Sequence, residues 1–171
     1  MLVPTIPKGV GYWGAGDGSR LALPRPETLI RPGWQVQDQD RIVAYLRSGT
    51  VCAGWCGLAH CRFPECGMSL GSCDLTDGEW LWPQGLEHYV VAHAVCLPET
   101  FVETMRTNGW QVPPALDGDA ILTTLEETGH LPFGDLSHWR SWAAAEQIAA
   151  ADAGRDPGFS EFTASQRGRR C

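Results

Sequence analysis

The 171-residue chain lacks the long apolar runs that mark membrane proteins. A membrane-spanning helix needs about eighteen consecutive apolar residues, and no such run occurs. Prolines and glycines interrupt residues 1–20, where a secretory signal would need a continuous apolar stretch. We therefore expect a soluble, cytoplasmic protein that does not bind membranes.

Basic residues are also scarce. The chain has 13 Lys and Arg against 20 Asp and Glu, which gives a formal net charge of −7. Affinity for nucleic acid usually depends on clustered Lys and Arg that release counterions, so nucleic acid is not an expected partner. The single local basic cluster, Arg167, Arg169 and Arg170, lies in a tail over residues 155–171 that we expect to be loosely ordered.

Charged residues make up only 19% of the chain, whereas 20 glycines and 12 prolines indicate many turns. This length and composition predict one globular domain over residues 1–154, with a mostly helical α+β fold. Residues 1–37 are too rich in proline and glycine for regular structure, and we expect an extended arm on the core. The side chains expected to anchor this arm are Leu21, Leu23, Leu29, Ile30 and Trp34.

Several amphipathic or alanine-rich segments predict helices. In residues 38–49, Asp38 suits the N-terminal cap and Gly49 suits the position after the last turn. A helix that begins at Pro98 should end near Asn108 and Gly109. Further helices are predicted over residues 119–127 and 137–154.

Cysteines are abundant, with seven in the chain and five of them between Cys52 and Cys73. In a reducing compartment a cluster of this kind is more often metal-binding or catalytic than disulfide-bonded. Residues 68–82, which include the last cysteine of this cluster, predict a β-hairpin that turns at Thr76, Asp77 and Gly78. Pro83 suits the first turn of a helix that would carry His88 and His93.

The spacing of two cysteines and two histidines along the chain predicts a zinc site. Cys61-x4-Cys66 is followed, after 21 residues, by His88-x4-His93. Structural Zn²⁺ sites are tetrahedral and commonly take two thiolates from a turn and two imidazoles from a helix. Residues 51–97 would then form a hairpin–helix core that the metal stabilises, with Cys61, Cys66, His88 and His93 as ligands.

Two observations weigh against this ligand set. Residues five positions apart on a straight helix differ by about 140° in direction, although a distorted last turn would reduce that angle. Cys52, Cys56 and Cys73 lie close enough in sequence to replace a ligand. The alternative is that both histidines lie on the surface or cap a helix, and that the cysteines are small buried apolar residues.

The expected role is that of a binding or scaffold module for an unidentified protein partner, with a structural zinc site. The sequence has no H-E-x-x-H motif, which disfavours an enzyme. The alternative is a small metal-dependent hydrolase that uses the same site, with Asp77 or Glu79 as base. Tryptophans and tyrosines form either a recognition surface or the core, namely Trp80, Trp82, Tyr89, Trp139 and Trp142.

The segment GSCDLTDGEWLWPQGLEHYVVAHAVCLPETFV resembles the characteristic segment of a family of small, uncharacterised bacterial proteins. In that family a Cys-rich turn precedes T-D-G, an aromatic-rich strand, W-P-x-G-L-x-H-Y-V, a second histidine and L-P-x-x-F. The resemblance covers about residues 40–105 and leaves the C-terminal third outside. It implies a shared metal-binding or structural element with the same four ligands and no established activity; Cys52, Cys56 and Cys73 do not belong to the pattern.

Overall fold

The computed structural model describes residues 5–14 and 21–153, and these residues have an α+β fold. More of them lie in α-helices than in strands, as predicted. The tail over residues 155–171, predicted to be loosely ordered, lies outside the described residues. The described elements are β1 (Lys8–Gly9), the short 3₁₀ helix η1 (Pro26–Leu29), α1 (Gln39–Arg47), β2 (Thr50–His60), β3 (Ser69–Thr76), β4 (Trp80–Pro83), α2 (Leu86–His93), α3 (Glu99–Thr107), α4 (Gly118–Glu127) and α5 (Ser137–Asp152).

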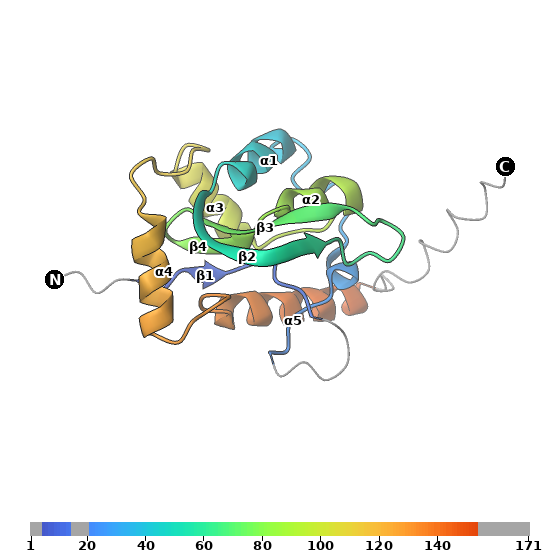
Figure 1. Cartoon of the computed structure of the whole chain (residues 1–171). Coiled ribbons are helices and arrows are strands. Elements are labelled where there is room, and N and C mark those ends of the chain that lie inside the picture. The colour runs from blue at the N-terminus through green and yellow to red at the C-terminus, as the bar shows by residue number, and fades with distance from the viewer. Residues whose placement is uncertain (1–4, 15–20, 154–171) are drawn as a thin grey trace.

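The strands form one mixed sheet in the order β1-β4-β3-β2. β1 runs parallel to β4, whereas the β3–β4 and β2–β3 pairs are antiparallel. Figure 1 shows α1, α2 and α3 on one side of the sheet, α5 on the other side and α4 at one end. Within the described residues, no helix has the length and apolar character needed to cross a membrane.

The core lies on both faces of β4, whose side chains alternate. Trp80 and Trp82 are completely buried in the main apolar cluster, and Leu81 points to a smaller cluster with Cys52 and Leu125. Tyr89 and Trp139 are buried in the main cluster too, and Trp142 packs partly buried against it. These aromatic residues therefore fill the core, which is one of the two alternatives that the sequence left open, and they do not form a recognition surface.

The N-terminal arm is a more integral part of the fold than predicted. Leu29 is fully buried, Leu23, Ile30 and Trp34 are partly buried against the core, and Leu21 is exposed. The arm also supplies β1, which extends the sheet, and two further core residues that the sequence analysis missed, Val10 and Tyr12. A two-residue strand has no periodicity to detect, so its presence depends on pairing with β4.

The helices α1, α3, α4 and α5 are confirmed within two residues of their predicted ends. α4 begins one residue earlier than predicted, at Gly118, because Asp117 caps it: its side chain accepts a hydrogen bond from the Ala120 N–H at 3.1 Å. Asp38 does stand at the cap position of α1, but its carboxylate makes ion pairs with Arg41 and Arg106 instead of a capping bond.

The hairpin of β3 and β4 is confirmed, but the predicted role of Pro83 is wrong. Pro83 is the last residue of β4, where it lies opposite Asp74, and α2 begins only at Leu86. Gly85 makes the change of direction, with φ of 88°. A Cβ at this position would lie 2.6 Å from the Cβ of Leu70, so glycine is needed both for the backbone conformation and for the close approach.

Strand β2 was not predicted as a strand. Residues 50–60 contain two glycines and two alanines, and their sequence shows no regular alternation of apolar and polar residues. In the structure only Cys52 and Ala53 of this strand are buried. Hydrogen bonding to β3 keeps the segment extended, and the register of the two strands shifts after Val51 and again after Gly54. Tertiary pairing, not local preference, therefore forms this strand.

We expect Gly85→Ala to destabilise the protein more than Gly33→Ala. Both glycines have left-handed φ values, 88° and 81°, but a Cβ at Gly33 would meet nothing within 4 Å. The left-handed conformation should cost about 1 kcal/mol in both variants, and overpacking against Leu70 should add about 1–3 kcal/mol at Gly85 alone. Chemical denaturation measures both costs, and equal destabilisation would contradict the close approach.

Candidate metal centre

The tip of the β2–β3 hairpin presents two thiols. Cys61 directly follows β2, and its N–H donates to the carbonyl of Met68 at 2.9 Å, which closes the connection between the strands. Within this connection the N–H of Cys66 donates to the carbonyl of Phe63 at 3.0 Å. These turns hold both cysteine side chains half-buried on the same side of the hairpin tip.

Helix α2 brings two imidazoles to the same place through a widened last turn. The N–H of Ala94 bonds to the carbonyl of Tyr89, five residues back instead of four, and the N–H of Val95 bonds to the same oxygen at 3.0 Å. The Nε2 atoms of His88 and His93 thus lie 3.2 Å apart. The five-residue spacing therefore does not keep the two imidazoles apart.

The four side chains converge on one point. The ligand atoms of Cys61, Cys66, His88 and His93 all lie within 4.8 Å of one another. The Cys61 Sγ lies 3.3 Å from the His93 Nε2, and the Cys66 Sγ lies 3.2 Å from the His88 Nε2. A tetrahedral ion with usual zinc bond lengths would separate sulfur from nitrogen by about 3.6 Å and nitrogen from nitrogen by about 3.3 Å. The observed distances are close to these values, so the group could hold a metal ion.

Neighbouring residues hold the ligand side chains in place. The ring of Phe63 stacks on that of His93 with centroids 3.9 Å apart and planes inclined by 12°, and Phe63 is only 3% exposed. The Tyr89 hydroxyl accepts from the Arg62 N–H at 2.9 Å and also bonds to the Cys61 thiol. Such outer contacts orient metal ligands and limit their freedom.

The protonation of the group responds to burial. Burial raises the pKa of the Cys61 thiol, and a backbone hydrogen bond from Phe63 partly opposes this rise. Burial also lowers the pKa of His93, and the neighbouring His88 lowers it further. Two imidazole nitrogens that face two sulfurs can offer the lone pairs that a divalent cation would bind, and the cation would deprotonate the thiols.

The other cysteines that the structure describes lie outside this group. Cys52 is buried in the smaller apolar cluster, Cys56 is exposed, and Cys96 is buried in the main core. Cys73 is half-buried and packs against the main cluster. Among the described residues the cluster of potential ligands contains none of them, so the structure gives no replacement for the four predicted residues.

The acidic residues proposed as a base are engaged elsewhere. The carboxylate of Asp77 accepts from the Trp80 N–H at 2.7 Å and from the Tyr45 hydroxyl at 2.8 Å, which fixes the β3–β4 turn. The carboxylate of Glu79 pairs with Lys8 at 3.1 Å. The group of four potential ligands contains neither residue.

Sequence reasoning missed Phe63 and Tyr89 as supports of the centre. Phe63 lies between the two cysteines in the segment CRFPEC, and an aromatic residue at that place was the signal that the sequence offered. The structure buries its ring. Tyr89 follows His88 directly, but only the folded hairpin brings its hydroxyl to Arg62 and Cys61.

Comparison with known proteins gives no relative from which the role of the centre could be transferred. No protein-family model matches the chain, and no curated protein or solved structure matches it either. The resemblance described from the motif is thus untested, and the assignment of the centre depends on the geometry of this chain.

Metal binding at this centre should release protons and strengthen as the pH rises. Two thiols must bind as thiolates, so about two protons should leave per ion near neutral pH, and affinity should rise up to about a hundredfold per pH unit. Cys61 is protonated before binding because its pKa is raised, whereas His93 is neutral because its pKa is lowered. Calorimetric zinc titration in buffers of different ionisation enthalpy counts the protons.

The exposed Cys56 lies outside the group, so the Cys56→Ser variant serves as the control and should release the same number of protons. Release of no protons on zinc binding would contradict ligation by Cys61 and Cys66.

Proposed function

We propose that the protein is a zinc-binding scaffold module in which one structural ion joins the β2–β3 hairpin to helix α2. The observation that carries this proposal is the convergence of two thiols and two imidazoles from segments 22 residues apart or more, with all ligand atoms within 4.8 Å. The four side chains are half-buried and lose part of their hydration where they face one another, and a bound ion would compensate for this loss.

The chemistry of the ligands favours zinc among common metals. Two thiolates and two imidazoles with near-tetrahedral spacing suit Zn²⁺, whereas Mg²⁺ and Ca²⁺ prefer oxygen ligands and more of them. Zinc has no redox chemistry that would oxidise the neighbouring thiols. We propose a reducing compartment such as the cytoplasm, where a cluster of thiols remains available to a metal.

The ligand count favours a structural over a catalytic ion. Four protein ligands complete a tetrahedron, whereas catalytic zinc usually keeps a position for water. The rival proposal, a metal-dependent hydrolase, also needs a base, and Asp77 and Glu79 bind Tyr45 and Lys8 instead. The structural role therefore has more support.

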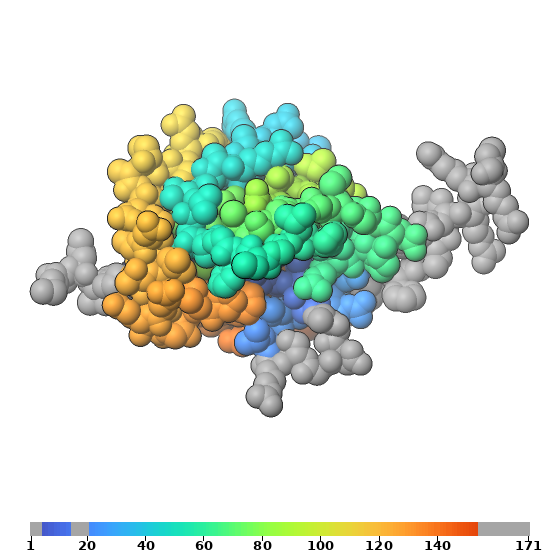
Figure 2. All heavy atoms as spheres, viewed as in Figure 1, coloured from blue at the N-terminus to red at the C-terminus, as the bar shows by residue number. Residues whose placement is uncertain are grey.

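A binding role finds support on the surface of β2. This strand is at the edge of the sheet, and Figure 2 shows it across the middle of the visible face, followed by the hairpin loop. Large apolar side chains are exposed there, namely Val51, Trp55, Leu58 and Met68. Exposed apolar residues along an edge strand are typical of surfaces that bind another protein. We propose that this surface binds a protein partner. We also propose that the metal-binding hairpin and helix are shared by the bacterial family whose motif the segment resembles.

Substitution of a ligand should remove zinc and stability together. We expect one zinc per chain in the native protein and none in Cys61→Ser or His93→Ala, measured by elemental analysis. Because zinc binding free energy becomes folding free energy, the melting temperature should fall by about 10 °C or more.

The matched controls are Cys56→Ser and His60→Ala, because both residues are exposed and lie outside the group. Both variants should keep the ion and the melting temperature. If the ligand variants lose zinc but melt as the native protein does, the ion is not structural, and the hydrolase alternative gains.

A further inference from the structure

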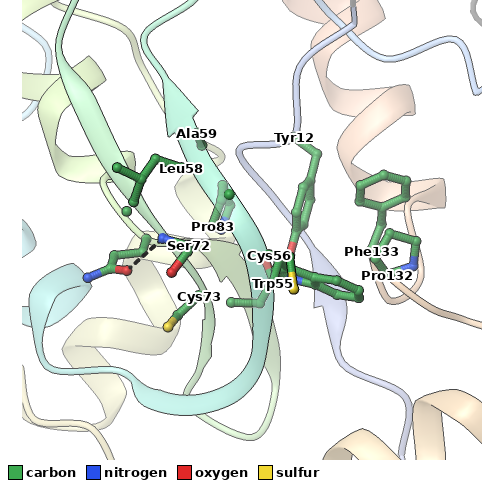
Figure 3. Close-up of a pocket in the computed structure, with 14 residues that line it drawn as sticks. Tyr12, Trp55, Cys56, Leu58, Ala59, Ser72, Cys73, Pro83, Pro132 and Phe133 are labelled. Carbon is green, nitrogen blue, oxygen red and sulfur yellow. Dashed lines mark hydrogen bonds between the residues drawn. The ribbon is translucent and has the colours of Figure 1, made fainter.

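A second site lies on the same hairpin, away from the metal centre. A cleft of about 390 Å³ opens between β2, β3 and the loop that precedes α5. Figure 3 shows Tyr12, Trp55 and Phe133 gathered along one side of the cleft. These three aromatic residues come from the N-terminal arm, from β2 and from the loop before α5, and the rings of Tyr12 and Phe133 have centroids 4.9 Å apart.

A buried carboxylate lies among these aromatic residues. Asp74 lines the cleft and is only 5% exposed. One oxygen accepts a hydrogen bond from the Tyr12 hydroxyl at 2.9 Å, and the other accepts from the Trp55 Nε1 at 2.5 Å. Since both oxygens accept from neutral donors, the contacts suit the ionised form of the carboxyl.

This carboxylate has no cationic partner among the residues described. None of the ion pairs within residues 5–14 and 21–153 includes Asp74, and no Lys or Arg from that part of the chain lines the cleft. Burial accordingly raises the pKa of Asp74, because ionisation is costly there without a counter-charge. A bound cation would remove this cost.

We propose that the cleft binds a small organic cation, a free amine or quaternary ammonium compound, with Asp74 as counter-ion and Tyr12, Trp55 and Phe133 as aromatic walls. Aromatic rings attract alkylammonium groups through the negative potential of their faces, and this attraction strengthens where water is excluded. The cleft volume is within the range of small-molecule sites. Apolar walls with one anionic group would reject anions and give neutral compounds little orientation.

The cation site does not depend on the proposed zinc site for its chemistry. The lining of the cleft includes none of the four potential metal ligands, although Cys56 and Cys73 contribute to it. The two cysteines of the metal centre lie in the connection between β2 and β3, and Trp55 and Asp74 lie on these strands. A bound metal would therefore stabilise the strands that carry the cleft. Tests of the cation site therefore use the native protein with its metal content measured.

Choline and its uncharged analogue, in which carbon replaces nitrogen, test the role of the charge. We expect choline to bind saturably and to shift the amide resonances of β2, β3 and the loop before α5 in NMR titrations at constant ionic strength. The analogue has the same shape, and it should bind at least about tenfold more weakly. Equal binding of the two compounds, or no saturable binding of choline, would overturn the proposal.

The variant Asp74→Asn tests the counter-ion. The amide can accept from Trp55 and donate to the Tyr12 oxygen, so the local hydrogen bonds can be kept without the charge. Choline affinity should fall at least about tenfold. Asp152→Asn removes the same charge at an exposed position on α5 and should leave the affinity unchanged.

The variant Trp55→Ala tests the aromatic wall at a position that is 45% exposed, where a loss of folding is not expected. It should weaken choline binding while the zinc content and the melting temperature stay near those of the native protein. Unchanged choline affinity in both Asp74→Asn and Trp55→Ala would show that choline binds elsewhere and would overturn the assignment.

Discussion

The convergence of two thiols and two imidazoles is the constraint on which the arrangement of the hairpin depends. Cys61 and Cys66 lie at the tip of the β2–β3 hairpin, and His88 and His93 lie on a helix that packs against the main core. An ion bound by all four would fix the tip against α2. Phe63 and Tyr89 also join the hairpin tip to the helix, through ring packing and a hydrogen bond to the Arg62 N–H.

The rest of the fold explains why an ion that joins the hairpin tip to α2 would stabilise the protein. Trp80, Trp82 and Phe101 form a well-buried core around β4, and this core needs no metal to exclude water. By contrast, β2 buries only Cys52 and Ala53, and its pairing with β3 is irregular. The hydrophobic effect therefore stabilises this outer strand weakly, and a metal at its end would supply what burial does not. The cleft depends on the same strand, since Trp55 belongs to β2 and contacts Asp74 on β3.

The features that sequence could predict are those with a local signal. The ends of α1 and α3 were predicted from residue types that are common at helix ends, namely Asp38, Gly49, Pro98 and Gly109, although Asp38 makes no capping bond. The Asp77–Gly78 turn fixes the β3–β4 hairpin. The four potential ligands were identified from spacing, because zinc sites constrain how far apart ligands lie along the chain. The features that were missed depend on contacts between distant residues. β1 and β2 form by pairing, Pro83 ends a strand because Gly85 turns the chain against Leu70, and the contact of Asp74 with Tyr12 joins residues 62 positions apart.

The most direct test of the account is X-ray absorption spectroscopy of zinc in the purified native protein. A site made by Cys61, Cys66, His88 and His93 predicts two sulfur ligands at about 2.3 Å and two nitrogen ligands at about 2.0–2.1 Å, with no bound water. A different sulfur count, an oxygen ligand in the first coordination sphere, or a folded native protein without bound metal would contradict it.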